Sequence, residues 1–514
     1  MGNSDHHINK NKNNENSDTV DKTRLSHKWT ALGNTTIGTL LASLDTNIII
    51  VALPSIASDL GVSLFTMVWI VLGYSLVTAS ILLNFGRLAD MFGRVKLYTL
   101  GFMIFTVGSG LCSISQTGEQ LVLFRIIQSV GAAFLFSNSV AILTDAFAVK
   151  ERGKALGFNQ VAIVLGSVLG LVLGGFLTSY LGWRSVFWIN LPIGIFGCVW
   201  SYTSLRESKD LRTKGKEKGE GKIDWLGNFT FAAGLFLLLM GITFSSFGIL
   251  SSNFAVYMLI IGGVSVLVIF AFIEMNKNYP MFQFSLFKIK AFLGGNVAIL
   301  LNSIARGDFT LLISFYLQGA SMMLSPSEAG IYLIPVSASL AISGSVSGWL
   351  SDKYGTRLFV GIGLFVSAIG FMLLTQVGST TSFNQLLLPF SLLGAGFGIF
   401  ASPNRASIMN SVPANRRGVS ASTGTTLLYV GRSLSLSISF LIMTSIMPSE
   451  QVKDILLDFR NESTISILSS YQTINQFIFG MHLIFIVSAI LVLVAIYPAI
   501  IRDNCATKKL DEKA

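Results

Sequence analysis

The chain has 514 residues, of which 52% are hydrophobic and only 12% are charged. Soluble domains carry about 25% charged residues, so this composition excludes an ordinary water-soluble enzyme. The formal net charge of +10 is compatible with nucleic-acid binding, but the positions of the basic residues argue against it. The three cysteines (Cys112, Cys198 and Cys505) have neither metal-ligand spacing nor a disulfide pattern, so we expect no metal site.

Apolar runs recur along the whole chain, and each is about as long as the 20 residues that a helix needs to cross a bilayer. They predict an all-α polytopic membrane protein. The fourteen expected spans lie at residues 30–52, 67–85, 97–115, 121–143, 156–178, 186–204, 226–245, 254–273, 292–317, 328–350, 358–376, 385–403, 419–445 and 477–500. Residues 1–29 are rich in Asn, Asp, Lys and His, which favours a disordered tail.

The basic residues test this span count, because cytoplasmic loops collect Lys and Arg. With the N-terminus inside, the inner segments hold 30 of the 36 Lys and Arg residues and the outer loops hold 3. The remaining three, Arg125, Arg306 and Arg432, fall within spans. Both termini are therefore expected in the cytoplasm, and the basic charge needs no nucleic acid to explain it.

Two loops repeat one pattern. "GRLADMFGRVK" follows the second span and "GWLSDKYGTR" follows the tenth, and in each a Gly precedes an Asp by four residues and a second Gly by seven. The first loop holds Gly86, Asp90, Gly93 and Arg94, and the second holds Gly348, Asp352 and Gly355. Glycine permits a tight turn and close helix approach. The carboxylates can contact a helix N-terminus or an Arg, which suggests a latch between conformations.

These loops resemble motif A of the major facilitator superfamily. The resemblance extends from about Leu44 to Ile500, and several motifs are similar to those of its fourteen-span drug:proton antiporters. They are "LDTNIIIVALP" in the first span, "RIIQSVGAA" in the fourth, "WRSVFWINLPIG" before the sixth, and the shorter "DWLG", "FYLQ" and "SPSEAG".

The resemblance implies a major facilitator fold of two six-helix bundles with two extra central transmembrane helices. The expected parts are a tail (1–29), the N-terminal bundle (30–204), a cytoplasmic linker (205–225), two inserted helices (226–275), the C-terminal bundle (276–502) and a tail (503–514). Such transporters hold substrate between two halves that rock in alternating access.

The sequence departs from the family pattern in two places. Ser129 stands where motif B has glycine, and Leu171 replaces the proline of the antiporter-associated motif in the fifth span. Helix-packing glycines remain there at Gly166, Gly170, Gly174 and Gly175, the first three of which share one helix face. The missing proline removes an expected kink and weakens the argument for export over uptake.

Ionisable residues inside a membrane are costly and therefore mark candidate functional sites. Asp45 and Arg125 are expected at similar depth, where a proton-coupling pair is one interpretation and a static ion pair the other. Gln128 lies one helical turn from Arg125. Arg306 and Asp308 are expected near mid-membrane, either facing the cavity or in an interhelical pair. Arg432 either pairs with Asp308 or accepts an anionic group.

The leading hypothesis is a proton-coupled antiporter that exports hydrophobic or cationic drugs or toxic compounds across the plasma membrane. Asp45 and Arg125 would couple the proton, and Asp308 would help to bind substrate. Its partners are a small molecule, protons and the bilayer; we expect a monomer, no nucleic acid, and no cofactor beyond the proton gradient. No catalytic constellation is visible, so an enzyme is not expected. One alternative is a carrier for a single metabolite, siderophore, tetracycline-like compound or lipid, and another is a non-transporting sensor or scaffold.

Overall fold

The computed structural model describes residues 5–147, 151–205, 224–249, 253–277, 280–319, 321–379, 381–413, 416–453, 455 and 467–501. Every regular element in these ranges is helical, and fourteen helical segments are long and apolar enough to cross a membrane. The prediction of an all-α protein with fourteen spans is therefore confirmed. The linker at 206–223 and the tail at 502–514 lie outside the described residues.

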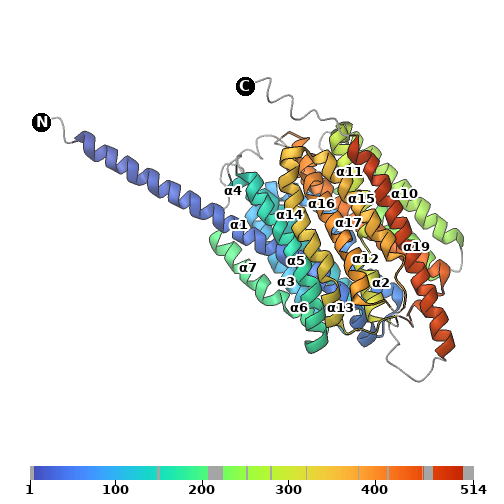
Figure 1. Cartoon of the computed structure of the whole chain (residues 1–514). Coiled ribbons are helices and arrows are strands. Elements are labelled where there is room, and N and C mark those ends of the chain that lie inside the picture. Colours follow the sequence, from blue (N-terminus) through green and yellow to red (C-terminus); the bar gives the residue numbers. More distant parts are fainter. Residues whose placement is uncertain are drawn as a thin grey trace.

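The first six spans form one bundle, in which α1 packs on α4 and α5, α2 and α3 pack on α4, and α7 packs on α3 (Figure 1). Its helices are α1 (Asp5–Leu60), α2 (Leu64–Phe92), α3 (Arg94–Ser113), α4 (Gly118–Ala146), α5 (Arg152–Leu181), α6 (Ser185–Trp188) and α7 (Asn190–Ser204).

The last six spans form a second bundle, centred on packing of α16 against α14 and α15 and of α11 against α17 and α19. It contains η1 (Phe284–Lys288), α11 (Lys290–Arg306), α12 (Phe309–Gln318), α13 (Pro326–Tyr332), α14 (Ile334–Tyr354), α15 (Thr356–Leu374), α16 (Phe383–Asn410), α17 (Arg417–Ile446), α18 (Ser449–Lys453) and α19 (Ile467–Ile500).

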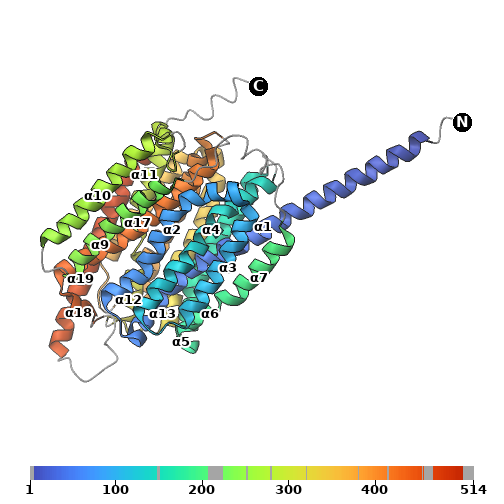
Figure 2. The same cartoon turned by 180° about the vertical axis from the view of Figure 1, so that it is seen from behind.

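Between the bundles in sequence stands a hairpin of α9 (Trp225–Phe247) and α10 (Asn253–Met275). Helix α9 contacts α2 of the first bundle and α17 of the second, which the reverse view shows side by side (Figure 2). Only 17% of the most apolar stretch of α10 is buried. The outer face of this hairpin is therefore suited to contact with lipid.

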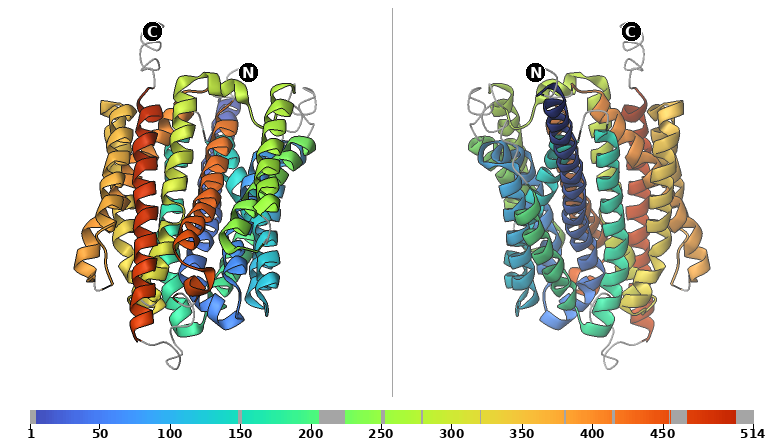
Figure 3. Two further views of the ribbon diagram at one scale, coloured as in Figure 1. Left: turned by 90° about the vertical axis from the view of Figure 1, so that its right-hand side faces the viewer. Right: turned by 90° about the vertical axis from the view of Figure 1, so that its left-hand side faces the viewer.

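The start of α1 and the end of α19 lie at the same end of the bundle (Figure 3). We call this the terminal end and the opposite one the distal end. Helix α1 begins at Asp5, whereas the sequence favours a disordered tail up to residue 29. Residues 5–27 contain no glycine or proline, so no residue there breaks the helix.

The span expected at 292–317 differs from a simple helix, because α11 ends at Arg306 and α12 begins at Phe309. Gly307 and Asp308 form the break inside the second bundle. A non-helical step at membrane depth is tolerated only where protein or a cavity satisfies the backbone. Here the Asp308 amide donates to the Ser435 hydroxyl at 3.2 Å, so α17 supplies the missing partner.

Candidate functional site

The first candidate site is the carboxylate of Asp45, which is 0% exposed and lies at the centre of the N-terminal bundle. Arg125 Nη1 donates to Oδ2 at 2.7 Å. Gln128 Nε2 and Asn190 Nδ2 donate to Oδ1 at 2.8 and 2.9 Å. One acidic group thus collects donors from α4 and α7, and the only charge among these donors is that of Arg125.

Arg125 is fixed by more than this ion pair. The same Nη1 also donates to Gln128 Oε1 at 2.6 Å, and the guanidinium carbon lies 4.2 Å from the ring centre of Tyr74 on α2. Gln128 in turn donates to the Ser109 hydroxyl on α3 at 2.6 Å. The fourth span therefore presents Arg125 and Gln128, one turn apart, to a network that links α1, α2, α3, α4 and α7.

Local sequence explains how the helices come so close. A Cβ on Gly108 of α3 would lie 2.7 Å from the Cα of Gln128, so only glycine allows α3 to meet α4 beside the network.

Asn190 is the first residue of α7, directly after the short α6. At the distal end, Trp183 and Arg184 both donate to Asp59 at 2.8 Å and fix the entry into this segment.

The second carboxylate, Asp308, lies at the break between α11 and α12 and is 2% exposed. Its Oδ1 accepts from Ser435 at 2.8 Å and its Oδ2 accepts from Ser439, both on α17. Asp308 is the nineteenth residue of its span, and Asp45 is the eighteenth of the span that begins at Lys28. The two carboxylates thus occupy matching positions in the first span of each bundle, but only Asp45 has an arginine partner in the described part of the chain.

Arg306 and Arg432 lie near each other, and neither forms an ion pair with Asp308. The Arg306 guanidinium lies 4.7 Å from the ring centre of Phe397, and it is close enough to Arg432 for their charges to repel. The pairing of Arg432 with Asp308 that the sequence allowed is not found. Ser435 and Ser439 of the same helix donate to the carboxylate oxygens instead.

The two repeated loops have matching backbones at the terminal end. Gly93 joins α2 to α3 with φ 104°, and Gly355 joins α14 to α15 with φ 87°, a region that favours glycine. Arg94 donates to Asp145 at the end of α4 at 2.7 Å.

For the other residues of the proposed latch, the structure gives fewer contacts. Asp352 is exposed. A Cβ on Gly348 would lie 2.6 Å from the Ser402 hydroxyl on α16, so α14 and α16 are close here. The side chain of Asp90 and the surroundings of Gly86 lie outside the described part, although α2 runs through both positions.

The glycines of the fifth span face α1. Cβ atoms on Gly166, Gly170 and Gly174 would lie 2.5, 2.6 and 2.7 Å from the carbonyl oxygens of Leu40, Leu44 and Ile48, respectively. The three glycines thus contact three successive turns of α1, the helix that carries Asp45. Gly175 faces the other bundle instead, against the carbonyl of Pro326.

Several hydrogen bonds join the two bundles. Towards the distal end, Gln318 of "FYLQ" donates to the Val51 carbonyl at 3.1 Å, and the Ser327 amide of "SPSEAG" donates to the Ser179 hydroxyl at 3.0 Å. Nearer the terminal end, Arg405 donates to Gln160 at 2.6 Å. Arg405 was expected in a loop, but α16 continues to Asn410 and carries it into the interface.

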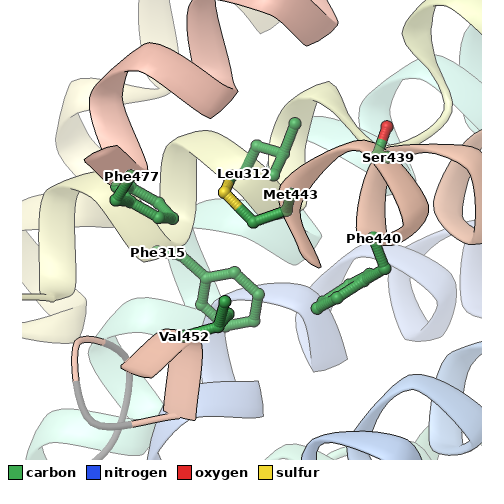
Figure 4. Close-up of a pocket in the computed structure, with 7 residues that line it drawn as sticks. All are labelled: Leu312, Phe315, Ser439, Phe440, Met443, Val452 and Phe477. Atoms are coloured by element: carbon green, nitrogen blue, oxygen red, sulfur yellow. The ribbon is translucent and has the colours of Figure 1, made fainter. Parts of the chain in front are cut away.

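A small cavity of about 30 Å³ lies between the bundles. Its walls come from α1 and α2 on one side and from the α11–α12 break and α17 on the other. The lining residues are Thr46, Ile50, Val71, Leu72, Ser75, Gly307, Leu311, Arg432, Ser433 and Leu436. A second cavity of about 10 Å³, shown in Figure 4, is lined by apolar side chains and Ser439, and no charged group is among its lining residues.

The sequence matches the Major Facilitator Superfamily over residues 35–436, well over half of the chain. The protein belongs to this superfamily. Among solved structures, a bacterial homologue of the human lysosomal transporter Spinster, in an inward-facing and occupied conformation, superposes with a TM-score of 0.61 at 16% identity. That match covers 94% of this chain and 98% of the other. The major facilitator fold is therefore shown.

Curated relatives of this superfamily member are transporters. The riboflavin transporter RibZ of Clostridioides difficile is 30% identical over 82% of this chain and 88% of its own length. Multidrug resistance protein 3 of Bacillus subtilis is 28% identical over 84% of this chain and 82% of its own. The chain is thus a multi-pass membrane protein of a transporter family.

Sequence reasoning missed four contributors to these sites. Asn190 lies within a motif that was recognised as a whole, but its contact with Asp45 requires knowing how α7 packs. Ser109, Ser435 and Ser439 carry no sequence signal of their own, since serine is common in these spans. A spacing of four between Ser435 and Ser439 places both on one helix face, and this is the one pattern that could have pointed to Asp308.

Proposed function

We propose that the protein is a secondary active transporter that exports hydrophobic organic compounds in exchange for protons. The observation that supports this most is the Asp45 carboxylate, fully buried and held by Arg125, Gln128 and Asn190. Burying an ionisable group inside a membrane costs free energy, so its presence there points to a functional role.

Protonation of Asp45 gives the site two states. In the charged state the carboxylate neutralises Arg125, and the pair is neutral as a whole. A proton on Asp45 removes that neutralisation and leaves a guanidinium buried without a counter-charge, which costs about 3–5 kcal/mol. Such a cost is large enough to drive a rearrangement of the bundle, which is what coupling to a proton requires.

The proton site adjoins the cavity along α1. Asp45 points into the N-terminal bundle, whereas the next residue, Thr46, lines the cavity between the bundles. Consecutive helical residues point about 100° apart, so a small rotation of α1 moves both at once. Proton binding and substrate binding are thereby linked through one helix.

The sequence and the relatives support export as the direction of transport and the plasma membrane as the location. The basic loops favour both termini in the cytoplasm and a plasma-membrane location. Relatives include multidrug resistance protein 3 of Bacillus subtilis and a tetracenomycin C resistance and export protein of Streptomyces glaucescens. Together with the fourteen spans, these names favour the drug:proton antiporter branch, with the loops at Gly93 and Gly355 as its conformational latches.

A carrier for one class of metabolite is the second candidate. It is favoured by the similarity to a riboflavin transporter and by Leu171 in place of the motif proline. A panel of unrelated substrates separates the two, because an exporter of the first kind accepts several chemical classes and a carrier accepts one.

The test uses energised inside-out vesicles and a pH-sensitive dye. Addition of ethidium, dansylamide or dansylglycine should release protons from vesicles with the wild-type protein and not from those with Asp45→Asn. Asp59→Asn is the matched control, because Asp59 lies on the same helix but contacts Trp183 and Arg184 at the distal end. If no compound evokes a response from folded wild-type protein, proton-coupled export is wrong.

A further inference from the structure

The C-terminal bundle holds an excess of positive charge next to the cavity. Arg306 on α11 and Arg432 on α17 form no ion pair with any described residue, and Arg306 lies against the face of Phe397. In the N-terminal bundle, by contrast, Arg125 is neutralised by Asp45 at 2.7 Å. The two bundles therefore present different charges to a substrate between them.

The nearby carboxylate does not cancel this charge by contact. The oxygens of Asp308 accept from the hydroxyls of Ser435 and Ser439, and the residue is 2% exposed. Even when Asp308 is counted as charged, the two arginines exceed it by one positive charge. Asp45 is likewise unavailable to a substrate, because its oxygens are shared among Arg125, Gln128 and Asn190.

The cavity itself has one charged lining residue among otherwise apolar or hydroxyl-bearing ones. Arg432 lines it beside Gly307, which follows Arg306 in the chain. Ile50, Val71 and Leu72 form the facing surface on α1 and α2. Leu311 and Leu436 continue the apolar lining on the side of Arg432. When the bundles separate to admit a ligand, these surfaces offer it apolar side chains and a single guanidinium.

We propose that this cavity selects amphiphilic organic anions, whose carboxylate or sulfonate group binds Arg432 while the hydrophobic body contacts α1 and α2. A guanidinium donates two parallel hydrogen bonds to such an oxyanion, and the neighbouring Arg306 adds to the attraction. A cation in the same place would be repelled by both arginines at low dielectric. The inference rests on the proposed transport function but replaces the cationic substrates that the sequence favoured.

Three dansyl probes with one fluorophore and different charge test this selectivity. Dansylglycine is an anion, dansylamide is neutral and dansylcadaverine is a cation at pH 7. Equilibrium binding to the purified full-length protein is measured by the rise in dansyl fluorescence. Wild type should bind dansylglycine most tightly, and Arg432→Gln should weaken that binding roughly ten- to hundredfold while changing dansylamide binding little.

Two further variants complete the design. Arg432→Lys keeps the charge and should retain part of the preference for dansylglycine. Lys288→Gln removes one positive charge from an exposed side chain of η1 and should leave all three affinities unchanged. If wild type prefers dansylcadaverine, binds none of the probes, or loses all three equally in Arg432→Gln, the proposal is overturned.

The binding experiment and the proton-release experiment can contradict the two proposals independently. Selective binding of dansylglycine without proton release would refute the proposed antiport and leave the anion site intact. Proton release evoked by ethidium or dansylcadaverine but not by dansylglycine would support antiport and refute the anion site.

Discussion

A single methyl group added at Gly170 should disturb the contact between α1 and α5 directly beside Asp45. A Cβ there would lie 2.6 Å from the Leu44 carbonyl oxygen. Carbon–oxygen contacts normally begin at about 3.3–3.6 Å, so Gly170→Ala must separate the two backbones by roughly 0.7–1 Å. Overpacking of this kind costs about 1–3 kcal/mol.

The matched control lies on the same helix. Gly157 has nothing within 4 Å of its Cβ position, so Gly157→Ala gains helix propensity without a clash. That gain is common to both variants, and the difference between them therefore measures the packing cost alone. A difference of about 1–3 kcal/mol corresponds to roughly 2–12 °C in Tm.

Thermal unfolding can be followed with a maleimide dye that becomes fluorescent on reacting with Cys112. This thiol is 0% exposed in α3 and reacts only when the N-terminal bundle opens. Cys198 and Cys505 are replaced by serine in all variants. Because Leu44 precedes Asp45, Gly170→Ala should also slow proton-coupled transport. Equal Tm values for the two alanine variants would refute the argument that α1 and α5 depend on this approach.

Three further outcomes are expected. Arg125→Lys should abolish substrate-evoked proton release in vesicles, because one ammonium group cannot reproduce the guanidinium contacts with Asp45 and Gln128; near-normal release would contradict this. Ser439→Ala removes a donor from the buried Asp308 and should cost about 1–3 kcal/mol in thermal unfolding of the whole protein followed by circular dichroism. Ser437→Ala, on the same helix, removes a buried hydroxyl with no partner in the described part and should cost nothing; equal losses would exclude a special role for Ser439. Burial opposes the charge of Asp224, but hydrogen bonds with Glu274, Lys277 and Gly227 outweigh burial and hold its pKa below the usual 3.8. The stability that this provides is present above pH 3.8 and lost as pH falls below it. Asp224→Asn should therefore lower Tm at pH 7, and an unchanged Tm would contradict this.

The sequence predicts those features that depend on repetition and on rare residues. Fourteen apolar runs, two matching glycine loops and one unusual carboxylate in the first span were enough to expect the fold and the approach of Asp45 to Arg125. Arginine and aspartate are scarce inside spans, so each one stands out.

What the sequence could not predict depends on helix rotation and helix breaks. Arg306 and Asp308 were expected in one continuous span (292–317), but the chain leaves the helix at Gly307 and Asp308 accepts from Ser435. The end of α16 shows the same limit, since its continuation to Asn410 moves Arg405 from an expected loop to Gln160 of the other bundle.

The inserted hairpin has a consequence for solutes that dissolve in the lipid. Near the distal end, Phe244 and Phe247 of α9 contact Phe65 of α2, and Phe247 also contacts Phe440 of α17. This aromatic group covers the seam between α2 and α17, so a compound in the bilayer meets packed rings there. Among the described helices, the contact between α5 and α14 is accompanied by α13 of the same span rather than by an inserted hairpin. The two flanks of a fold built from two similar bundles therefore present different surfaces to the bilayer.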